Sequence, residues 1–132
     1  MDHALRAALL TWLNASPDLS RQLNSISEDN VASTSAPFLT IAASAAADWS
    51  TKDRCGREIR IAVQLSTRGD DAAADGELVR RIEKRISDLP RVQNGFDIIN
   101  TRFLRARTER LPRNQRAVLL EYSFRLFQTP SE

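Results

Sequence analysis

Residue types on which most site chemistry depends are scarce in this sequence. Its 132 residues include one cysteine, one histidine and four glycines. A single cysteine excludes an internal disulfide bond, and a single histidine excludes a histidine-rich metal site. The glycines do not cluster, so the chain holds no glycine-rich loop of the kind that cradles phosphates.

Long apolar runs are also missing. The longest uncharged apolar stretch, PFLTIAASAAA at 37–47, is shorter than the roughly 20 residues that span a bilayer, so we expect no contact with a membrane. The start of the chain, MDHALRAALL, carries charged residues where an export signal needs an apolar run. Composition is otherwise typical of a globular protein, and the length predicts a single domain, 1–132, with a frayed tail at 128–132.

Hydrophobic spacing predicts two helices and four strands. Apolar residues recur at helical spacing in 2–15 and between the acidic segment 70–77 and Pro90. Strands are predicted where apolar and polar residues alternate, at 38–46, 57–67, 97–109 and 117–127. The order helix-strand-strand-helix-strand-strand predicts an α+β fold, in which two helices pack on one face of an antiparallel sheet of four strands or slightly more.

The alternation also predicts which strand faces are buried. The expected core residues of the second and fourth strands are Ile59, Ile61, Val63, Leu65, Val118, Leu120, Tyr122, Phe124 and Leu126. A further short turn is expected through Leu19–Leu23, and 24–36 is interpreted as a loop with at most a short strand near Val31.

The residues able to carry catalysis lack partners. His3, the only histidine, has no orienting group near it in the sequence, and no histidine is placed to activate Cys55. The carboxylates of Asp70, Asp71 and Asp75 are explained by the dipole at a helix N-terminus more simply than by a metal ion. We therefore predict that the protein is not an enzyme and holds no cofactor or metal.

Arginine dominates the positive charge. The chain has seventeen arginines and two lysines, with a net charge of +2. Six arginines gather near the C-terminus against the single acid Glu109; they are Arg102, Arg105, Arg107, Arg110, Arg113 and Arg116. Because guanidinium groups suit phosphates and carboxylates, the cluster predicts contact with nucleic acid or with acidic residues of a neighbouring subunit. A solvated strand face that protects a sheet edge is the alternative.

The polar segment 48–58, DWSTKDRCGRE, is a second candidate interface. Polar loops of this length within a hairpin are uncommon and are often functional. The segment places one aromatic residue amid three cations, and the residues of interest are Trp49, Lys52, Arg54 and Arg57. Tryptophan is enriched at the centres of protein interfaces. The alternative is that Trp49 folds back to cap the core.

Four short segments follow one another in an order that is typical of one protein family. Pro37–Phe38 opens the first predicted strand, Trp49–Lys52 forms a W-S-T-K loop, Gly56–Glu58 leads into an alternating strand, and Ser66–Ala72 links that strand to a helix. In this order and spacing the chain resembles the small tail-completion proteins of long-tailed phages. That family includes the tail-terminator and tail-to-head joining components of siphophages and gene transfer agents.

The resemblance implies a structural virion protein that assembles in the host cytoplasm and does no catalysis. Such proteins form a homo-oligomeric ring, usually of six, at the head-proximal end of the tail tube, where they end tube polymerisation. The implied partners are the tail tube protein, the head-side connector or stopper protein, and DNA that passes through the lumen without sequence specificity. No small-molecule substrate is implied. A small nonspecific nucleic-acid-binding protein is the alternative that the arginines leave open.

Overall fold

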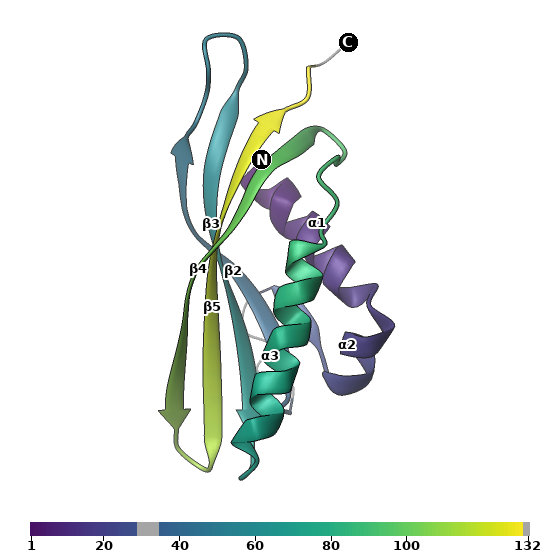
Figure 1. Ribbon diagram of the computed structural model, residues 1–132, viewed down its shortest axis with the longest axis vertical. Coiled ribbons are helices and arrows are strands. Elements are labelled where there is room, and N and C mark those ends of the chain that lie inside the picture. Colours follow the sequence, from purple (N-terminus) through teal and green to yellow (C-terminus); the bar gives the residue numbers. More distant parts are fainter. Residues whose placement is uncertain (29–34, 131–132) are drawn as a thin grey trace.

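The computed structural model describes residues 1–28 and 35–130. Within them the elements are α1 (Asp2–Asn14), α2 (Pro17–Gln22), β1 (Ile26–Glu28), β2 (Phe38–Asp48), β3 (Gly56–Arg68), α3 (Ala72–Ser87), β4 (Phe96–Leu111) and β5 (Gln115–Gln128). The strands form one sheet in the order β1-β2-β3-β5-β4. Figure 1 shows the helices gathered on one side of this sheet.

The predicted α+β class is confirmed, but the predicted number of helices was too small and the predicted strand order missed β1. The sheet has five strands, within the predicted four or slightly more, and β1 pairs with β2 in parallel, so the sheet is not purely antiparallel. Strand β1 has three residues, too few to show any alternation. The turn expected through Leu19–Leu23 is largely the helix α2, which begins at Pro17 and is capped by the Ser16 hydroxyl.

Two predictions fall partly or wholly outside the described residues. The short strand predicted near Val31 is one, because Val31 lies outside the described residues. The frayed tail predicted at 128–132 is the other, because its last two residues also lie outside them. Within that tail, the backbone N–H groups of Gln128 and Thr129 donate to the carbonyls of Cys55 and Gly95 at 2.9 and 3.0 Å.

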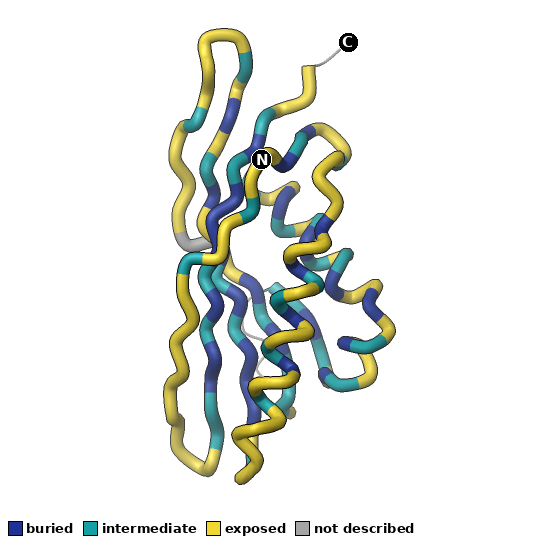
Figure 2. Tube along the Cα trace, viewed as in Figure 1, coloured by how far each residue is buried: buried dark blue, intermediate teal, exposed yellow. Residues whose placement is uncertain are grey.

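The core lies between the helices and one face of the sheet, as the burial colours of Figure 2 show. The predicted core faces are confirmed, because the apolar residues expected to point inward from β3 and β5 are all at most 6% exposed. The helices cover them with a second apolar layer, made by Leu5, Leu9, Leu13, Leu78, Ile82 and Ile86. No helix of the described residues lies on the opposite face of the sheet, which we call the uncovered face.

The two hairpins point in opposite directions along the molecule's length (Figure 1). The β2–β3 tip lies at one end and the β4–β5 tip at the other. The segment 48–58, predicted as one long loop, is shorter in the structure, because β2 runs to Asp48 and β3 starts at Gly56. Trp49 N–H donates to the Gly56 carbonyl at 2.9 Å and closes this end of the hairpin.

A reciprocal contact between Trp12 and Arg85 ties α1 to α3. The Trp12 indole N–H donates to the Arg85 carbonyl at 2.7 Å, and the Arg85 guanidinium donates to the Trp12 carbonyl at 3.0 and 2.6 Å. The guanidinium carbon also lies 3.5 Å from the centroid of the indole ring. This contact joins residues far apart in sequence and fixes the helices against each other.

Replacing Arg85 by alanine is expected to lower the free energy of unfolding by about 1–2 kcal/mol, because hydrogen bonds and a cation–π contact are lost together. The matched control is Arg80→Ala, which removes an exposed side chain paired with Glu77 on the same helix. That change should cost about 0.5 kcal/mol or less. Chemical denaturation of both variants measures the difference, and equal effects would contradict this account.

Candidate interaction surfaces

The strand register determines the face on which each arginine of the C-terminal cluster lies. Residues paired across antiparallel strands place their side chains on the same face. On β5, Leu120, Tyr122 and Phe124 are core residues, so the residues that alternate with them lie on the uncovered face. The face on which each β4 side chain lies therefore follows from the face of its cross-strand partner on β5.

Three of the six arginines lie on the uncovered face. Arg102 pairs with Ser123, Arg105 with Glu121, and Arg107 with Leu119. Arg102 and Arg107 have no ion pair with any residue that the structure describes. These three arginines form a row along β4, which we call the arginine row.

The other three arginines are directed elsewhere. Arg110 and Arg116 pair with each other across the hairpin and lie on the helix side of the sheet. Arg113 lies in the tip of the β4–β5 hairpin, with a φ of 63°. The six arginines predicted as one cluster therefore belong to two faces and a turn.

Arg116 belongs to a partly buried ion pair rather than to an exposed patch. Its Nε lies 2.6 Å from Oδ2 of Asp75, and its Nη2 lies 3.2 Å from the other carboxylate oxygen. The two side chains are 12% and 13% exposed. Thr67 donates a further hydrogen bond to Asp75 at 3.0 Å. The hydrogen bond to Asp75 raises the pKa of the Arg116 guanidinium, so the pair stays charged.

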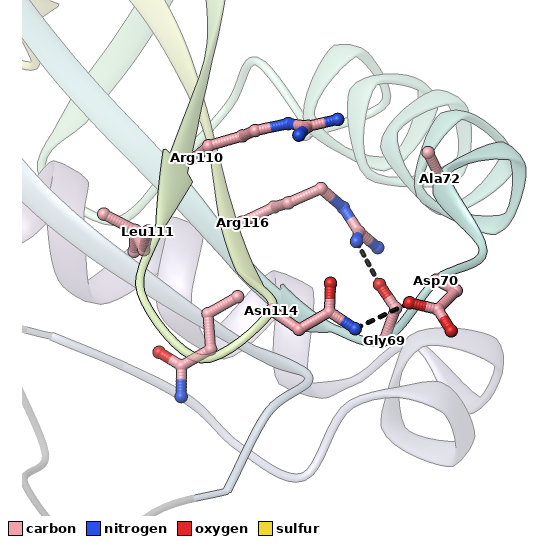
Figure 3. Close-up of a pocket in the computed structure, with 8 residues that line it drawn as sticks. Gly69, Asp70, Ala72, Arg110, Leu111, Asn114 and Arg116 are labelled. Atoms are coloured by element: carbon pink, nitrogen blue, oxygen red, sulfur yellow. Dashed lines mark hydrogen bonds between the residues drawn. The ribbon is translucent and has the colours of Figure 1, made fainter.

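A polar pocket of about 500 Å³ opens beside this pair at the tip of the β4–β5 hairpin. Figure 3 shows Arg110 and Arg116 extending into it from the hairpin, with Asp70 on the facing link between β3 and α3. Asn114 donates to Asp70 at 2.8 Å, and Arg116 donates to the Gly69 carbonyl. These contacts fasten the hairpin tip to the start of α3.

Within the arginine row, Arg105 forms an ion pair with Glu121 of the neighbouring strand. The hydrogen bond from Arg105 lowers the pKa of the Glu121 carboxyl, and the charges of Arg105, Arg107 and Arg60 lower it further. The pair therefore persists as pH falls through the range where a free glutamate takes up its proton.

The variant Arg105→Gln is expected to raise the pKa of Glu121 toward the ordinary value of about 4.3, because the main hydrogen bond that favours the carboxylate is lost. Titration of the Glu121 side chain by NMR measures the shift. The control is Arg68→Gln, since Arg68 lies on β3 and on the same uncovered face of the sheet as Arg105. It should leave the pKa of Glu121 unchanged. A Glu121 pKa that does not move in Arg105→Gln would contradict the assignment.

The β2–β3 tip is held to β5 by an aromatic–arginine stack, which consists of Trp49, Phe127, Arg54 and Arg125. The Trp49 and Phe127 rings stack with centroids 4.8 Å apart. The Arg54 guanidinium lies 4.5 Å from the Phe127 centroid, and that of Arg125 lies 5.3 Å from the Trp49 centroid. Trp49 thus folds back onto the sheet, but on the uncovered face rather than over the core.

The four loop residues predicted as one interface, Trp49, Lys52, Arg54 and Arg57, also lie in different places. Trp49 and Arg54 meet on the Phe127 ring, and Arg54 forms an ion pair with Asp97 at 3.7 Å. Arg57 lies on the helix side, 3.8 Å from the Asp2 carboxylate. Lys52 is exposed at the tip.

Sequence reasoning missed the part of the stack that β5 provides. Phe127 and Arg125 pair with Gly56 and Glu58 of β3. Only the strand register reveals these pairs, since the partners are distant in the sequence. Gly56, at the entry to the predicted strand, carried the one available signal, because a glycine in a strand often marks close backbone approach.

The three aspartates weighed against a metal site have separate roles. Asp71 accepts from Ala74 N–H at 3.2 Å and caps α3, while Asp75 and Asp70 bind Arg116 and Asn114. Over residues 1–28 and 35–130, no group of three or more His, Cys, Asp and Glu is placed to hold a metal ion. In the same described part, no helix is long and apolar enough to cross a bilayer.

Comparison with known proteins identifies one family and one fold. The family model described as tail completion protein gp17 matches residues 7–126. No curated protein matches the sequence. Among solved structures, the chain is similar to a chain of the structure titled "Virion of native gene transfer agent (GTA) particle", with a TM-score of 0.72 and 19% identity over 95% of this chain and 96% of that chain. At this identity the likeness shows a shared fold.

Proposed function

The chain belongs to the family of tail completion protein gp17, and we propose that its copies close into a ring of six at the head-proximal end of a tail tube. The ring ends polymerisation of the tube and joins the tail to the head-side connector. The protein is thus a structural part of the virion tail. The family match over 7–126 carries this proposal, and the fold shared with a virion chain supports it.

The arrangement of layers favours one orientation in such a ring. Helices on one side of the sheet need more room than bare strands, so the helix-covered face suits the outside of a ring. The uncovered face then lines the lumen and carries the arginine row toward passing DNA. Arginine contacts with phosphates are independent of base sequence, as a DNA channel requires.

The two hairpin tips suit contacts above and below the ring. They lie at opposite ends of the molecule (Figure 1), so one can meet the tube while the other meets the connector. Each tip carries an exposed cation, Lys52 at the β2–β3 tip and Arg113 at the β4–β5 tip. Acidic surfaces on the tube protein and on the connector are the complementary partners.

Omission of this chain from an assembling particle tests the proposal. We expect tails of uncontrolled length or tails unjoined to heads, seen by negative-stain microscopy. Charge reversal at both tips, Lys52→Glu with Arg113→Glu, should weaken joining while leaving the fold intact, because both side chains are exposed. Normal particles without the chain would contradict the proposal. Tight DNA binding by single copies with a steep salt dependence would instead favour a nucleic-acid-binding protein.

A further inference from the structure

Each outer strand of the sheet is covered at one end and open at the other. Strand β1 pairs with β2 along Leu39–Ile41, and among the described residues nothing pairs with the outer edge of β2 from Ala45 to Asp48. Strand β4 is covered near its start, where Ile98 N–H donates to the Arg91 carbonyl at 2.8 Å and Arg91 donates to the Ile99 carbonyl. Its outer edge is open from Asn100 to Leu111 in the described structure.

Most residues of the open part of β4, which we call the arginine edge, are exposed (Figure 2), and Thr101 and Leu104 are half-buried. It carries the arginine row and Arg110 against the single acid Glu109. It also exposes apolar side chains, since Phe103 is 46% exposed and Leu111 is 36% exposed. The charges oppose pairing of this edge with an unmatched strand, while its unpaired backbone groups and exposed apolar side chains leave it able to pair with a strand of complementary charge and side-chain size.

The open part of β2 has the opposite character, and we call it the alanine edge. It consists of Ala45, Ala46, Ala47 and Asp48, all exposed. Alanine is depleted in strands, and natural sheets protect open edges with lysine, proline or bulky charges. The alanine edge has no such protection before Asp48. Its small side chains leave room for long side chains of a paired strand.

We propose that the alanine edge of one copy pairs with the arginine edge of a second copy, so that the sheet continues from subunit to subunit. This inference rests on the proposed ring and specifies how neighbouring copies join. The arginine side chains lie across the alanines, and Asp48 adds an opposite charge. Two arginine edges would repel each other, so β4 of one copy pairs with β2 of its neighbour rather than with the neighbour's β4. Contacts between two different edges can close into a ring.

Engineered cysteines test the pairing directly. Adjacent strands lie about 4.8 Å apart, within the Cα separation that a disulfide accepts. Rotation about the ring axis keeps each residue at its own level. The strand pairings put Ala45 and Arg102 at the same level, because Ala45 pairs with Arg60 of β3, Arg60 with Ser123 of β5, and Ser123 with Arg102 of β4. These pairings also place both side chains on the uncovered face. We expect tails that carry a mixture of Ala45→Cys and Arg102→Cys, both with Cys55→Ser, to yield a disulfide between the two variants on mild oxidation. Ala47→Cys with Arg102→Cys extends the test to the next residue on the same face.

Ala46→Cys is the matched control, because Ala46 pairs with Ile59 and points to the opposite face of the same strand. It should not cross-link to Arg102→Cys. All these positions are exposed, and thermal melting of each variant checks that the fold persists.

The outcomes separate this inference from the proposed function. Cross-links with Ala45→Cys or Ala47→Cys, but not with Ala46→Cys, support edge pairing. Tails that carry a visible ring but no such cross-link overturn the edge pairing and leave the ring in place. Tails of normal length without any ring overturn both.

Discussion

Gly56→Ala is expected to lower the free energy of unfolding by about 2–4 kcal/mol, a large loss for an exchange that adds one methyl group. A Cβ at this position would lie 2.5 Å from the Trp49 carbonyl oxygen and 3.0 Å from the Leu126 carbonyl oxygen. Both are backbone atoms held by hydrogen-bonded neighbours, Trp49 directly after β2 and Leu126 within β5, and they cannot turn away. The Phe127 ring, with Cδ1 at 3.0 Å, closes the third side.

Relief of this clash has to move the strands that meet at Gly56. Trp49 and Gly56 close the β2–β3 tip, and Gly56 pairs with Phe127 of β5. A shift here therefore also separates the aromatic rings of the stack. We expect Gly56→Ala to reduce the near-ultraviolet circular dichroism signal of Trp49 in addition to the free energy of unfolding.

Gly76→Ala is the matched control for this prediction. Gly76 lies within α3, and a Cβ there would have nothing within 4 Å. Because alanine favours helix over glycine, this change should stabilise the protein by about 0.5–1 kcal/mol. Urea denaturation of the two variants should give shifts of opposite sign. A Gly56→Ala protein as stable as the parent would show that the strands do not approach so closely.

Asp75→Ala is expected to lower the melting temperature by about 5–10 °C, because it leaves the Arg116 guanidinium partly buried without its carboxylate. Asp75 accepts hydrogen bonds from both Arg116 and Thr67, so one substitution removes an acceptor from both side chains and leaves Arg116 only the Gly69 carbonyl. The contact joins α3 to the β4–β5 hairpin, and its loss also frees the hairpin tip from the helix.

Asp70→Ala provides the comparison for Asp75→Ala. Asp70 is exposed and accepts from Asn114 at 2.8 Å in the same pocket. Its loss should change the melting temperature by about 2 °C or less. Differential scanning calorimetry of both variants measures the contrast. Equal melting temperatures for the two variants would mean that the Asp75–Arg116 pair does not hold the hairpin.

The sequence was sufficient to predict the core, because the alternation in β3 and β5 is regular and the helices of the described structure cover one face of the sheet. Strand β1 could not be predicted, since three residues are too few to show a pattern. Its pairing with β2 stabilises it, which depends on tertiary structure rather than on local preference.

The candidate site was harder to predict, because the placement of the arginines depends on irregular pairing in β4. The register shifts between Phe103 and Arg105. Strict alternation would place Arg102 on the face opposite Arg105 and Arg107. The extra residue of a bulge brings the three to one face. Residue spacing alone does not show such a shift.

The division of the predicted cluster also changes what each arginine is expected to do. Arg116 is bound to Asp75 and stabilises the fold. Arg102 and Arg107 remain on the exposed uncovered face, where they can meet DNA or a neighbouring copy. Functional substitutions are therefore best made at Arg102 and Arg107, since a change at Arg116 would mix loss of stability with loss of function.

Cryo-electron microscopy of purified tails tests the central claim most directly. The account predicts an annulus of identical copies of this chain at one end of the tube, with sheets on the inside and helices on the outside. Tails without the chain should lack the annulus and vary in length. A chain that is absent from finished tails, or that is found only as scattered single copies along the tube, would contradict the account.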